Sequence, residues 1–442
     1  MDDITGCITD LKDWDTFDSI IRIDKPIELG YAYLRDSTMF LLVQCMVNYP
    51  KPYIPTQPVL SLASFFSSKS DQRNIPSILD VGSIKHVTSG RVAIALALKQ
   101  MGIGKRDKVL IPAYHCPAMV EPVIWAEADP VFYKIQPDTS VDLNDIKNRI
   151  DGSTKLLIAA NYFGFPQDLV KIRDFCDSYG IYLLEDCAHS FFGVFEGKPL
   201  GAYGDYAIAS TMKFFPIYEG GCLVSGRNDI ERIELQSAGL AFEIKATLNT
   251  LERGLEYGRM SLLKKPLAIS LKLKDYLWQL VKRRSSGENK KIGPGASDGG
   301  FGFEVSWLHK RSSFSSRLLT KLSSKDRIIA RRRENYLTLL EALTGLPGCR
   351  PLFPDLPSGV VPHVFPLIVD NSAEIFSVLK RNGVPVVRFG EFLWHGVDES
   401  VCSVSTYLSQ NLLQFPCHQE LKSKEKQWMI EQIRKTILSF AE

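Results

Sequence analysis

The sequence predicts an α/β protein with a mostly parallel central sheet that helices cover on both faces. From about residue 81 to 226, short apolar segments alternate with helical segments, and this alternation implies crossover connections between parallel strands. After residue 325, helix and strand patterns occur in roughly equal measure, which predicts a smaller α+β domain. We therefore expect a lead-in over 1–80, a large α/β domain over 81–320 and a small C-terminal domain over 321–442.

The strands expected in the large domain are short apolar runs, which are typical of strands buried on both faces. They are Lys108–Pro112, Pro130–Ile135, Lys155–Ala160, Ile181–Glu185 and Gly221–Ser225. The helices expected between them are Arg91–Met101, Asp142–Ile150 and Asp168–Tyr179. The small domain is expected to contain helices at Lys325–Leu343, Ala373–Arg381 and Lys424–Phe440 and strands at Val361–Val369 and Val384–Val387.

Composition and charge exclude several function classes. The 442 residues include 53 Lys and Arg against 50 Asp and Glu, and 45% are hydrophobic. These values exclude wholesale disorder and argue against nucleic-acid binding driven by bulk charge. The nine cysteines are scattered singly without a CxxC pair, so we expect neither a disulfide framework nor a metal site. The N-terminus is acidic and lacks a secretory signal pattern, so we expect a soluble cytoplasmic protein.

The first motif that suggests chemistry is Thr88-Ser89-Gly90-Arg91, at the start of the first expected helix. Ser and Gly at a helix N-terminus leave backbone N–H groups at the positive end of the helix dipole, which suits a phosphate group. The alternative interpretation is that Ser89 simply caps the helix. Taken alone, the motif favours capping.

The second motif is Glu185-Asp186-Cys187-Ala188-His189-Ser190, directly after an apolar strand. The carboxyl ends of parallel strands line the ligand crevice of such sheets, so Asp186 is placed where functional residues lie. A carboxylate at that depth needs a cationic partner, because it is otherwise neutralised. The alternative is that Asp186 caps the next turn and His189 is a partly buried histidine with ordinary hydrogen bonds.

The third motif is Ser210-Thr211-Met212-Lys213, which follows another strand and precedes a loop that closes with Gly220-Gly221. An amine held at a strand end in partly apolar surroundings loses its proton more readily and becomes a nucleophile. A surface lysine before a turn is the alternative.

The three motifs, in this order, match the demands of pyridoxal phosphate (PLP). Its phosphate needs helix N–H donors and hydroxyls, its pyridine nitrogen needs a carboxylate, and its aldehyde needs a lysine amine for a Schiff base. The phosphate turn, the acidic residue and the lysine all follow strands of one alternating sheet. Together they favour a PLP site over the three structural alternatives.

The chain resembles the DegT/DnrJ/EryC1/StrS family of PLP-dependent sugar aminotransferases, which have fold type I. The resemblance runs through TSGRVAIALALKQMGIGKRDKVLIPAYHCPAMVEPV, LLIAANYFGFPQDL, LLEDCAHSFFG and LGAYGDYAIASTMKFFPIYEGGCLVS, and it continues near the end in LLQFPCHQEL. It covers residues 81–226 well and 325–442 more loosely. It implies a fold-type I PLP-transferase architecture and, by the family's habit, a homodimer with a two-subunit active site.

Residue by residue, the resemblance implies that Lys213 is the Schiff-base lysine and that Asp186 is the partner of the pyridine nitrogen. It places His189 near the phenolic oxygen of the cofactor. The phosphate-binding set that it implies consists of Ser89, Gly90, Arg91 and Ser210.

The sequence departs from the family pattern at several positions. Arg91 stands where the family usually has Thr, and it could add a charge-assisted contact to the phosphate. His115 or Cys116 aligns where an aromatic side chain often covers the pyridine ring, and the sequence does not decide between them. Asn161 replaces a frequent His.

The largest departure is residues 227–320, which look less regular than the rest of the large domain. They include a basic, partly amphipathic stretch over 262–284 and a Gly/Ser/Lys-rich segment over 285–302 that is expected to be a mobile loop. One hypothesis is that 262–284 forms an interfacial helix that contacts a membrane surface or lies near a lipid-linked substrate. A solvated basic helix that packs its Leu face on the body is the favoured alternative.

The resemblance implies amino transfer from glutamate to a nucleotide-linked keto-sugar in the biosynthesis of a surface polysaccharide or a related sugar. Lys213 favours amino transfer, because relatives that dehydrate sugars have His at this position. Two other interpretations stay open. The chain could be a catalytically altered PLP-fold protein with a regulatory role, or an aminotransferase for a non-sugar or a lipid- or carrier-linked ketone.

Overall fold

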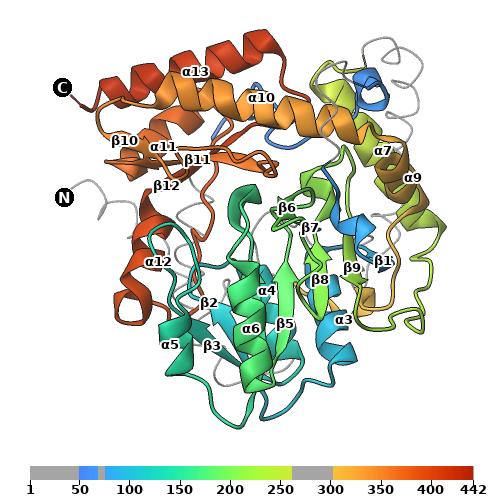
Figure 1. The fold of residues 1–442 in the computed structure, drawn as a ribbon. Coiled ribbons are helices and arrows are strands. Elements are labelled where there is room, and N and C mark those ends of the chain that lie inside the picture. Colours follow the sequence, from blue (N-terminus) through green and yellow to red (C-terminus); the bar gives the residue numbers. More distant parts are fainter. Residues whose placement is uncertain (1–48, 68–74, 261–301, 442) are drawn as a thin grey trace, which may run out of the picture. The chain divides into compact units, whose positions relative to one another are not determined.

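The computed structural model describes residues 49–67, 75–260 and 302–441, and a seven-stranded sheet forms the centre of this part of the chain (Figure 1). The strand order is β1 (Ser83–Val87), β9 (Gly221–Ser225), β8 (Tyr206–Ala209), β5 (Tyr182–Asp186), β4 (Thr154–Ala160), β2 (Lys108–Pro112) and β3 (Asp129–Tyr133). The strands from β8 to β3 pair in parallel, whereas β9 is antiparallel to both β8 and β1. The expected mostly parallel sheet is therefore confirmed.

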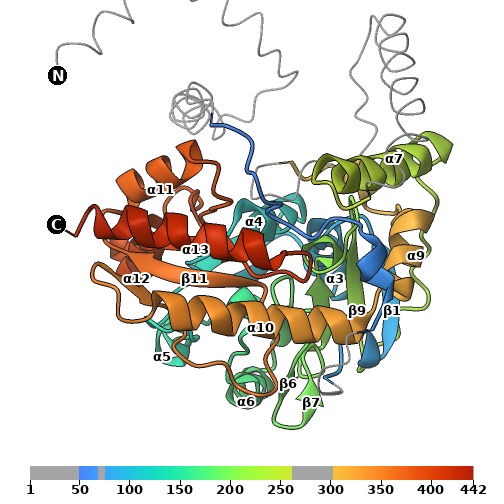
Figure 2. The same cartoon turned by 90° about the horizontal axis from the view of Figure 1, so that it is seen from above.

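Helices cover both faces of this sheet, as expected. The helices α3 (Gly90–Gln100) and α4 (Pro117–Trp125) pack against each other on one face, and α6 (Leu169–Tyr179) lies on the other (Figures 1 and 2). Because α3 follows β1 and α4 follows β2, the N-termini of both helices lie at the edge where the parallel strands end. The short elements of this region are α5 (Leu143–Lys147) and the β6–β7 pair (Val194–Phe195 and Lys198–Pro199).

Local sequence explains where α3 and α6 begin and end. The Ser89 hydroxyl caps α3 by accepting a hydrogen bond from the Val92 N–H at 3.3 Å, and the Ala and Leu residues that follow are strong helix formers. The Asp168 carboxylate caps α6 in the same way, and Gly180 ends it in a left-handed conformation. These two helices therefore start and stop within one or two residues of the predicted bounds.

The C-terminal region contains a smaller antiparallel sheet, as expected. Its strand order is β10 (Cys349–Pro351), β11 (Val364–Val369) and β12 (Leu412–Pro416). The helices of this region are α10 (Lys325–Leu343), α11 (Ser372–Arg381), α12 (Glu399–Asn411) and α13 (Ser423–Leu438). Figure 2 shows α10 and α13 side by side along this sheet. The α+β character of the region is confirmed, and the domain boundary at residue 320 stays a prediction.

Several elements differ from the predictions. The strand expected at Val384–Val387 does not form, because only Val387 pairs with a neighbouring strand, through Gln414 of β12. Within 227–320, which was expected to be less regular than the rest of the large domain, the structure shows two regular helices that were not predicted, α7 (Leu240–Glu256) and α9 (Phe314–Leu322). The basic stretch over 262–284 and all of the expected mobile loop except Gly302 lie outside the described residues.

None of the helices in the described ranges combines the length and the apolar character that a membrane span requires.

We expect Gly221→Ala to destabilise the fold, because β9 passes directly beneath the turn before α3. A Cβ on Gly221 would lie 2.5 Å from the carbonyl carbon of Ser89 and 2.8 Å from the nitrogen of Gly90, which is too close for any heavy atom. The main chain of the turn must then shift, with an expected loss of roughly 1–3 kcal/mol in the free energy of unfolding. Urea denaturation measures this loss.

Gly104→Ala serves as the control, because a Cβ there would meet only the Ala126 carbonyl oxygen, at an ordinary 3.7 Å. Its unfolding free energy should change by less than about 0.5 kcal/mol. Equal unfolding midpoints for the two variants would contradict the close approach of β9 to the turn.

Candidate active site

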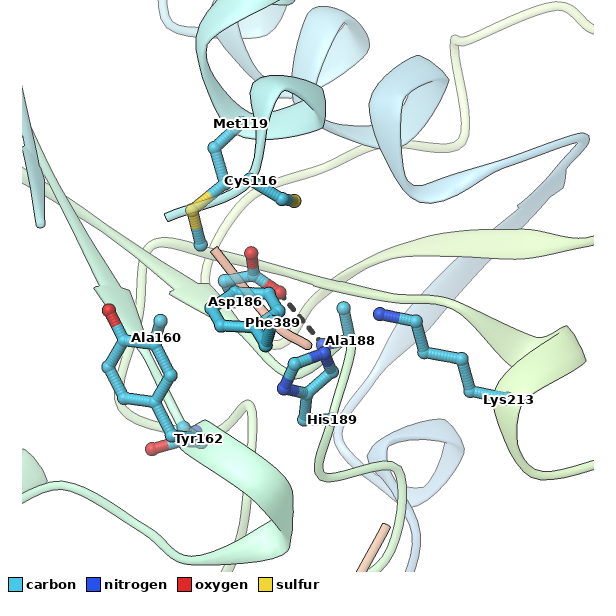
Figure 3. A pocket seen from close by; sticks show the side chains of 10 residues that line it. Cys116, Met119, Ala160, Tyr162, Asp186, Ala188, His189, Lys213 and Phe389 are labelled. Atoms are coloured by element: carbon cyan, nitrogen blue, oxygen red, sulfur yellow. Dashed lines mark hydrogen bonds between the residues drawn. The ribbon is translucent and has the colours of Figure 1, made fainter. Parts of the chain in front are cut away.

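A small pocket lies where the parallel strands β2, β4, β5 and β8 end (Figure 3). Because the carboxyl ends of parallel strands share one edge of the sheet, residues far apart in the sequence meet there. The ten side chains that line it are Cys116, Met119, Ala160, Asn161, Tyr162, Asp186, Ala188, His189, Lys213 and Phe389. Half of these residues belong to the set predicted from the sequence: Cys116, Asn161, Asp186, His189 and Lys213.

Asp186 is the last residue of β5 and is buried, with 5% of its surface exposed. One carboxylate oxygen accepts a hydrogen bond from the Ala188 N–H at 2.8 Å. Burial raises the pKa of Asp186, and the Ala188 N–H and the charge of Lys213 act in the opposite direction. An additional cation or N–H donor in the pocket would therefore stabilise the ionised carboxylate.

The neighbouring Glu185 is fully buried on the other side of the strand. Its carboxylate accepts hydrogen bonds from the backbone N–H groups of Gly201 at 2.8 Å, Tyr203 at 2.6 Å and Gly204 at 2.6 Å. These three bonds attach the end of β5 to the turn before β8, and so they fix the main chain that presents Asp186. The sequence analysis did not assign Glu185 a role, although two successive acidic residues at the end of an apolar strand must face opposite sides.

Lys213 lies in a single 3₁₀ turn, η5 (Thr211–Lys213), that directly follows β8. In Figure 3 its side chain extends into the pocket, and its amine points toward Ala188 and His189. The turn is joined to the end of the following loop, because the Thr211 N–H donates to the Gly220 carbonyl at 3.1 Å. Lys213 and Asp186, which were predicted to cooperate, therefore line one pocket from two different strand ends.

His189 is held between aromatic rings at the edge of this pocket. It stacks on His363 with ring centroids 4.8 Å apart and on Phe163 at 5.6 Å, and Phe389 meets it edge-on. Its Nδ1 atom lies 3.4 Å from the Phe163 N–H, which makes Nδ1 an acceptor. Burial, and next the charge of Lys213, lower the pKa of His189 well below its ordinary value. The imidazole is therefore neutral and carries its proton on Nε2.

The turn before α3 gathers the residues predicted for phosphate binding. Ser89 caps the helix with its hydroxyl, and Gly90 is the first helical residue, whose N–H has no partner within the helix. A Cβ on Gly90 would lie 4.0 Å from the Cβ of Ser210, so the serine that precedes η5 is adjacent to the turn. Capping by Ser89 and binding of an anion by the N–H groups are thus compatible.

The side chain of Arg91 turns toward α4. Its Nε lies 3.4 Å from a carboxylate oxygen of Glu121, and both groups are largely buried. The other oxygen of Glu121 accepts the Gly302 N–H at 2.7 Å. The charge of Arg91 is balanced by Glu121, and the predicted contact between this side chain and a phosphate stays a prediction.

The structure separates the two candidates for the residue that covers the ring. Cys116 lines the pocket, whereas His115 stacks on Phe132 with ring centroids 4.8 Å apart. The Nε2 atom of His115 accepts a hydrogen bond from the Trp394 N–H at 2.9 Å, and its Nδ1 faces the carbonyls of residues 112 and 113. His115 is therefore not brought to the pocket.

Asn161 lines the pocket, but its amide also has structural partners. Its Oδ1 accepts the Gln167 N–H at 2.9 Å, and its Nδ2 lies 3.5 Å from the sulfur of Cys187. These contacts fix the turn after β4, which also contains the pocket residue Tyr162.

The sequence analysis missed Met119, Ala160, Tyr162, Ala188 and Phe389. Ala188 could have been found, because it follows Asp186 by two residues in the same motif. Phe389 carries no such signal, since it lies in an irregular segment after β11 and reaches the pocket only through the packing of the C-terminal region. The Tyr114 hydroxyl donates to the Phe389 carbonyl at 3.1 Å and holds this segment in place.

The fold and the pocket define an α/β enzyme scaffold with a lysine and an aspartate at adjacent strand ends. Residues 79–262 match the DegT/DnrJ/EryC1/StrS aminotransferase family.

Individual relatives match only part of the chain or at low identity. GDP-perosamine synthase of Vibrio cholerae is 35% identical over 156 residues, which cover 33% of this chain and 42% of that protein. The match thus spans about two fifths of the relative's length.

Solved structures share the fold over most of the chain. The aminotransferase TlmJ from Streptoalloteichus hindustanus has a TM-score of 0.59 at 19% identity and covers 83% of this chain and 89% of its own. The protein ntda from Bacillus subtilis, solved with bound cofactor PMP, has a TM-score of 0.54 at 18% identity and covers 81% of this chain and 74% of its own.

We expect the stability of the fold to fall in mild acid, in part because of His115. Burial lowers the pKa of His115 to about 4 from an ordinary value of 6.5, although its bonds to backbone carbonyls oppose this shift. The unfolded chain therefore binds the proton at higher pH than the folded chain does. The contribution of His115 is fully present above about pH 6.5 and is lost as the pH falls toward 4.

His115→Gln removes this titration and keeps a side chain that can donate and accept hydrogen bonds. Between pH 6 and 5, urea denaturation should show wild type losing up to about 1.4 kcal/mol more than the variant. Parallel pH profiles for the two proteins would contradict the prediction.

Proposed function

We propose that this chain is a PLP-dependent aminotransferase that passes an amino group from glutamate to a nucleotide-linked keto-sugar. One observation carries the proposal: Lys213 and Asp186, at the ends of two paired strands, line one pocket, and Ser210, three residues before Lys213, is adjacent to the turn before α3. The family match over residues 79–262 supports the reaction class, and the PMP bound to the structurally similar Bacillus subtilis protein supports the cofactor.

The residues of the pocket suit the three parts of PLP. A protonated ring nitrogen beside Asp186 would supply the positive charge that this buried carboxylate needs. The turn with Ser89 and Gly90, together with the adjacent Ser210, offers N–H and hydroxyl groups to a phosphate. When bound, PLP supplies an aldehyde that takes up the donor's amino group and a ring that draws off the negative charge developing on the donor's α-carbon.

Each nearby side chain then has a defined task. The Lys213 amine would hold the cofactor as its nucleophile, and it would also carry the proton from the donor's α-carbon. Asp186 keeps the proton on the ring nitrogen by its charge. Neutral His189 can donate a hydrogen bond from Nε2. The stacking of its ring on His363 and Phe163 fixes the orientation of the imidazole.

The proposed acceptor and the proposed cellular compartment rest on one relative and on the cysteines. The name of the Vibrio cholerae relative refers to a GDP-linked sugar, which supports a nucleotide-linked keto-sugar as acceptor in polysaccharide or related sugar biosynthesis. The seven cysteines in the described ranges form no disulfide, which suits a reaction in the reducing cytoplasm. We also propose a homodimer, which sedimentation velocity of the purified protein would measure.

Lys213→Ala should abolish both cofactor attachment and amino transfer. Wild type incubated with PLP should develop the visible absorbance of the attached cofactor, lose it on addition of glutamate, and release 2-oxoglutarate. In the variant the attached-cofactor absorbance should be absent and the rate should fall by more than about 1,000-fold, because one amine serves as nucleophile and proton carrier.

Lys171→Ala provides the control, since Lys171 lies on α6 with 74% of its side chain exposed and should leave both signals unchanged. Glutamate-dependent release of 2-oxoglutarate by Lys213→Ala at the wild-type rate would overturn the proposal. A panel of nucleotide sugars then identifies the acceptor by the rise in thermal unfolding temperature.

Asp186→Asn should separate cofactor binding from catalysis. Asn can still accept the Ala188 N–H but has no charge with which to hold a proton on the ring nitrogen. We expect PLP to stay partly bound while the rate of amino transfer falls by at least about 100-fold. A variant that turns over glutamate as fast as wild type would exclude this role for Asp186.

A further inference from the structure

Arg332 of α10 is fully buried and is the largest fully buried side chain among the described residues. It lies against η5 (Thr211–Lys213), which we call the lysine turn. Its Nη2 donates to the Lys213 carbonyl at 2.7 Å. Its Nη1 donates to the carbonyls of Pro362 at 3.1 Å and His363 at 2.8 Å, and the guanidinium lies over the Phe214 ring at 4.4 Å. One side chain therefore joins the lysine turn to the segment before β11.

This guanidinium has no acidic partner in the part of the chain that the structure describes; its hydrogen-bond acceptors are main-chain carbonyls and the Gln419 side-chain amide. Burial lowers the pKa of Arg332 to about 10, so the group is still charged at neutral pH. Its neighbours on α10 behave differently, since Arg331 pairs with Glu334 at 2.7 Å and Arg327 pairs with Glu420 at 2.5 Å. Burying a cation without a counter-ion costs free energy unless its donors are satisfied. The five N–H donors of a guanidinium lie in one plane and can bind several carbonyls at once.

Gln419 completes the arrangement from the turn after β12. Its Oε1 accepts from the Arg332 Nε at 3.1 Å, and its Nε2 donates to the Phe214 carbonyl at 2.8 Å. Two successive carbonyls at the end of η5 are thus bound by two side chains that also bind each other. A single 3₁₀ turn leaves these carbonyls without helical partners, so their orientation depends on outside donors.

We infer that Arg332 and Gln419 are positioning residues that hold the main chain of Lys213 still while its side chain moves within the pocket. The inference rests on the role proposed for Lys213. The same guanidinium also binds the carbonyl of His363, whose ring stacks on His189. Arg332 therefore aligns two pocket residues, Lys213 directly and His189 through its neighbour, with the C-terminal region.

The test compares Arg332→Met, Arg332→Lys and Gln419→Leu with Arg333→Met as the matched control. Arg333 follows on the same helix and also donates to carbonyls, but these are the carbonyls of Pro357 at 2.7 Å and of Val360, in the segment before β11. Amide hydrogen exchange of the cofactor-free protein over residues 211–217 reports the main chain directly. Steady-state kinetics with glutamate and the visible circular dichroism of the PLP-loaded protein report how a change in this main chain affects catalysis and the bound cofactor.

Arg332→Met and Gln419→Leu should speed exchange in the lysine turn, alter the circular dichroism of bound PLP and lower kcat by roughly 10- to 100-fold. The KM for glutamate should change by less than about threefold, because binding groups stay in place. Arg332→Lys should recover part of kcat, and Arg333→Met should match wild type in exchange over 211–217.

If Arg332→Met fails to fold, Gln419→Leu and Arg332→Lys decide the question. Wild-type exchange, circular dichroism and kcat in both would overturn the inference. Failure of the wild-type protein to bind PLP would instead overturn the proposed function, and the exchange measurement on the cofactor-free protein would still show whether the two side chains hold the turn.

Discussion

Charged groups buried at one edge of the central sheet set the main constraint on this structure. A buried carboxylate or guanidinium must find donors, acceptors or an opposite charge, because water is not there to solvate it. Asp186 is close enough to Lys213 for the lysine charge to act on it, and Glu185 is satisfied by three backbone N–H groups. These hydrogen bonds and charge interactions fix the turns around the pocket, and the turns position the residues that line it.

Much of the fold follows from local signals in the sequence. The α10 prediction is correct at both ends, because Ser324 caps the helix and a long run of helix formers follows. Helices whose buried and exposed faces differ little in hydrophobicity were missed. The buried face of α7 consists of Phe242, Ala246, Thr250 and Gly254, of which only Phe242 is large and apolar. The helix α12 is rich in Ser and Thr, which have low helix propensity, and its stability comes from its packing.

The residues of the candidate site that lie at strand ends could be predicted from the sequence. Asp186, Lys213 and the turn before α3 could be placed together because parallel strands end at one edge. Residues from the C-terminal region, such as Phe389, Arg332 and Gln419, could not be placed, since no local pattern states which sheet edge a distant loop will cover. Coordinates were likewise needed to show that Cys116 and not His115 lines the pocket, because adjacent residues in a loop have no fixed alternation.

The contacts of Arg332 have a practical meaning for protein engineering. They go to main-chain oxygens at positions 213, 362 and 363, so the side chains at the latter two positions can be exchanged without removing an acceptor. A library that varies Met119 and Ala160 of the pocket wall would therefore leave these contacts intact as long as residues 332 and 419 are kept constant. Directed evolution of this chain would therefore treat residues 332 and 419 as fixed positions in addition to Lys213 and Asp186.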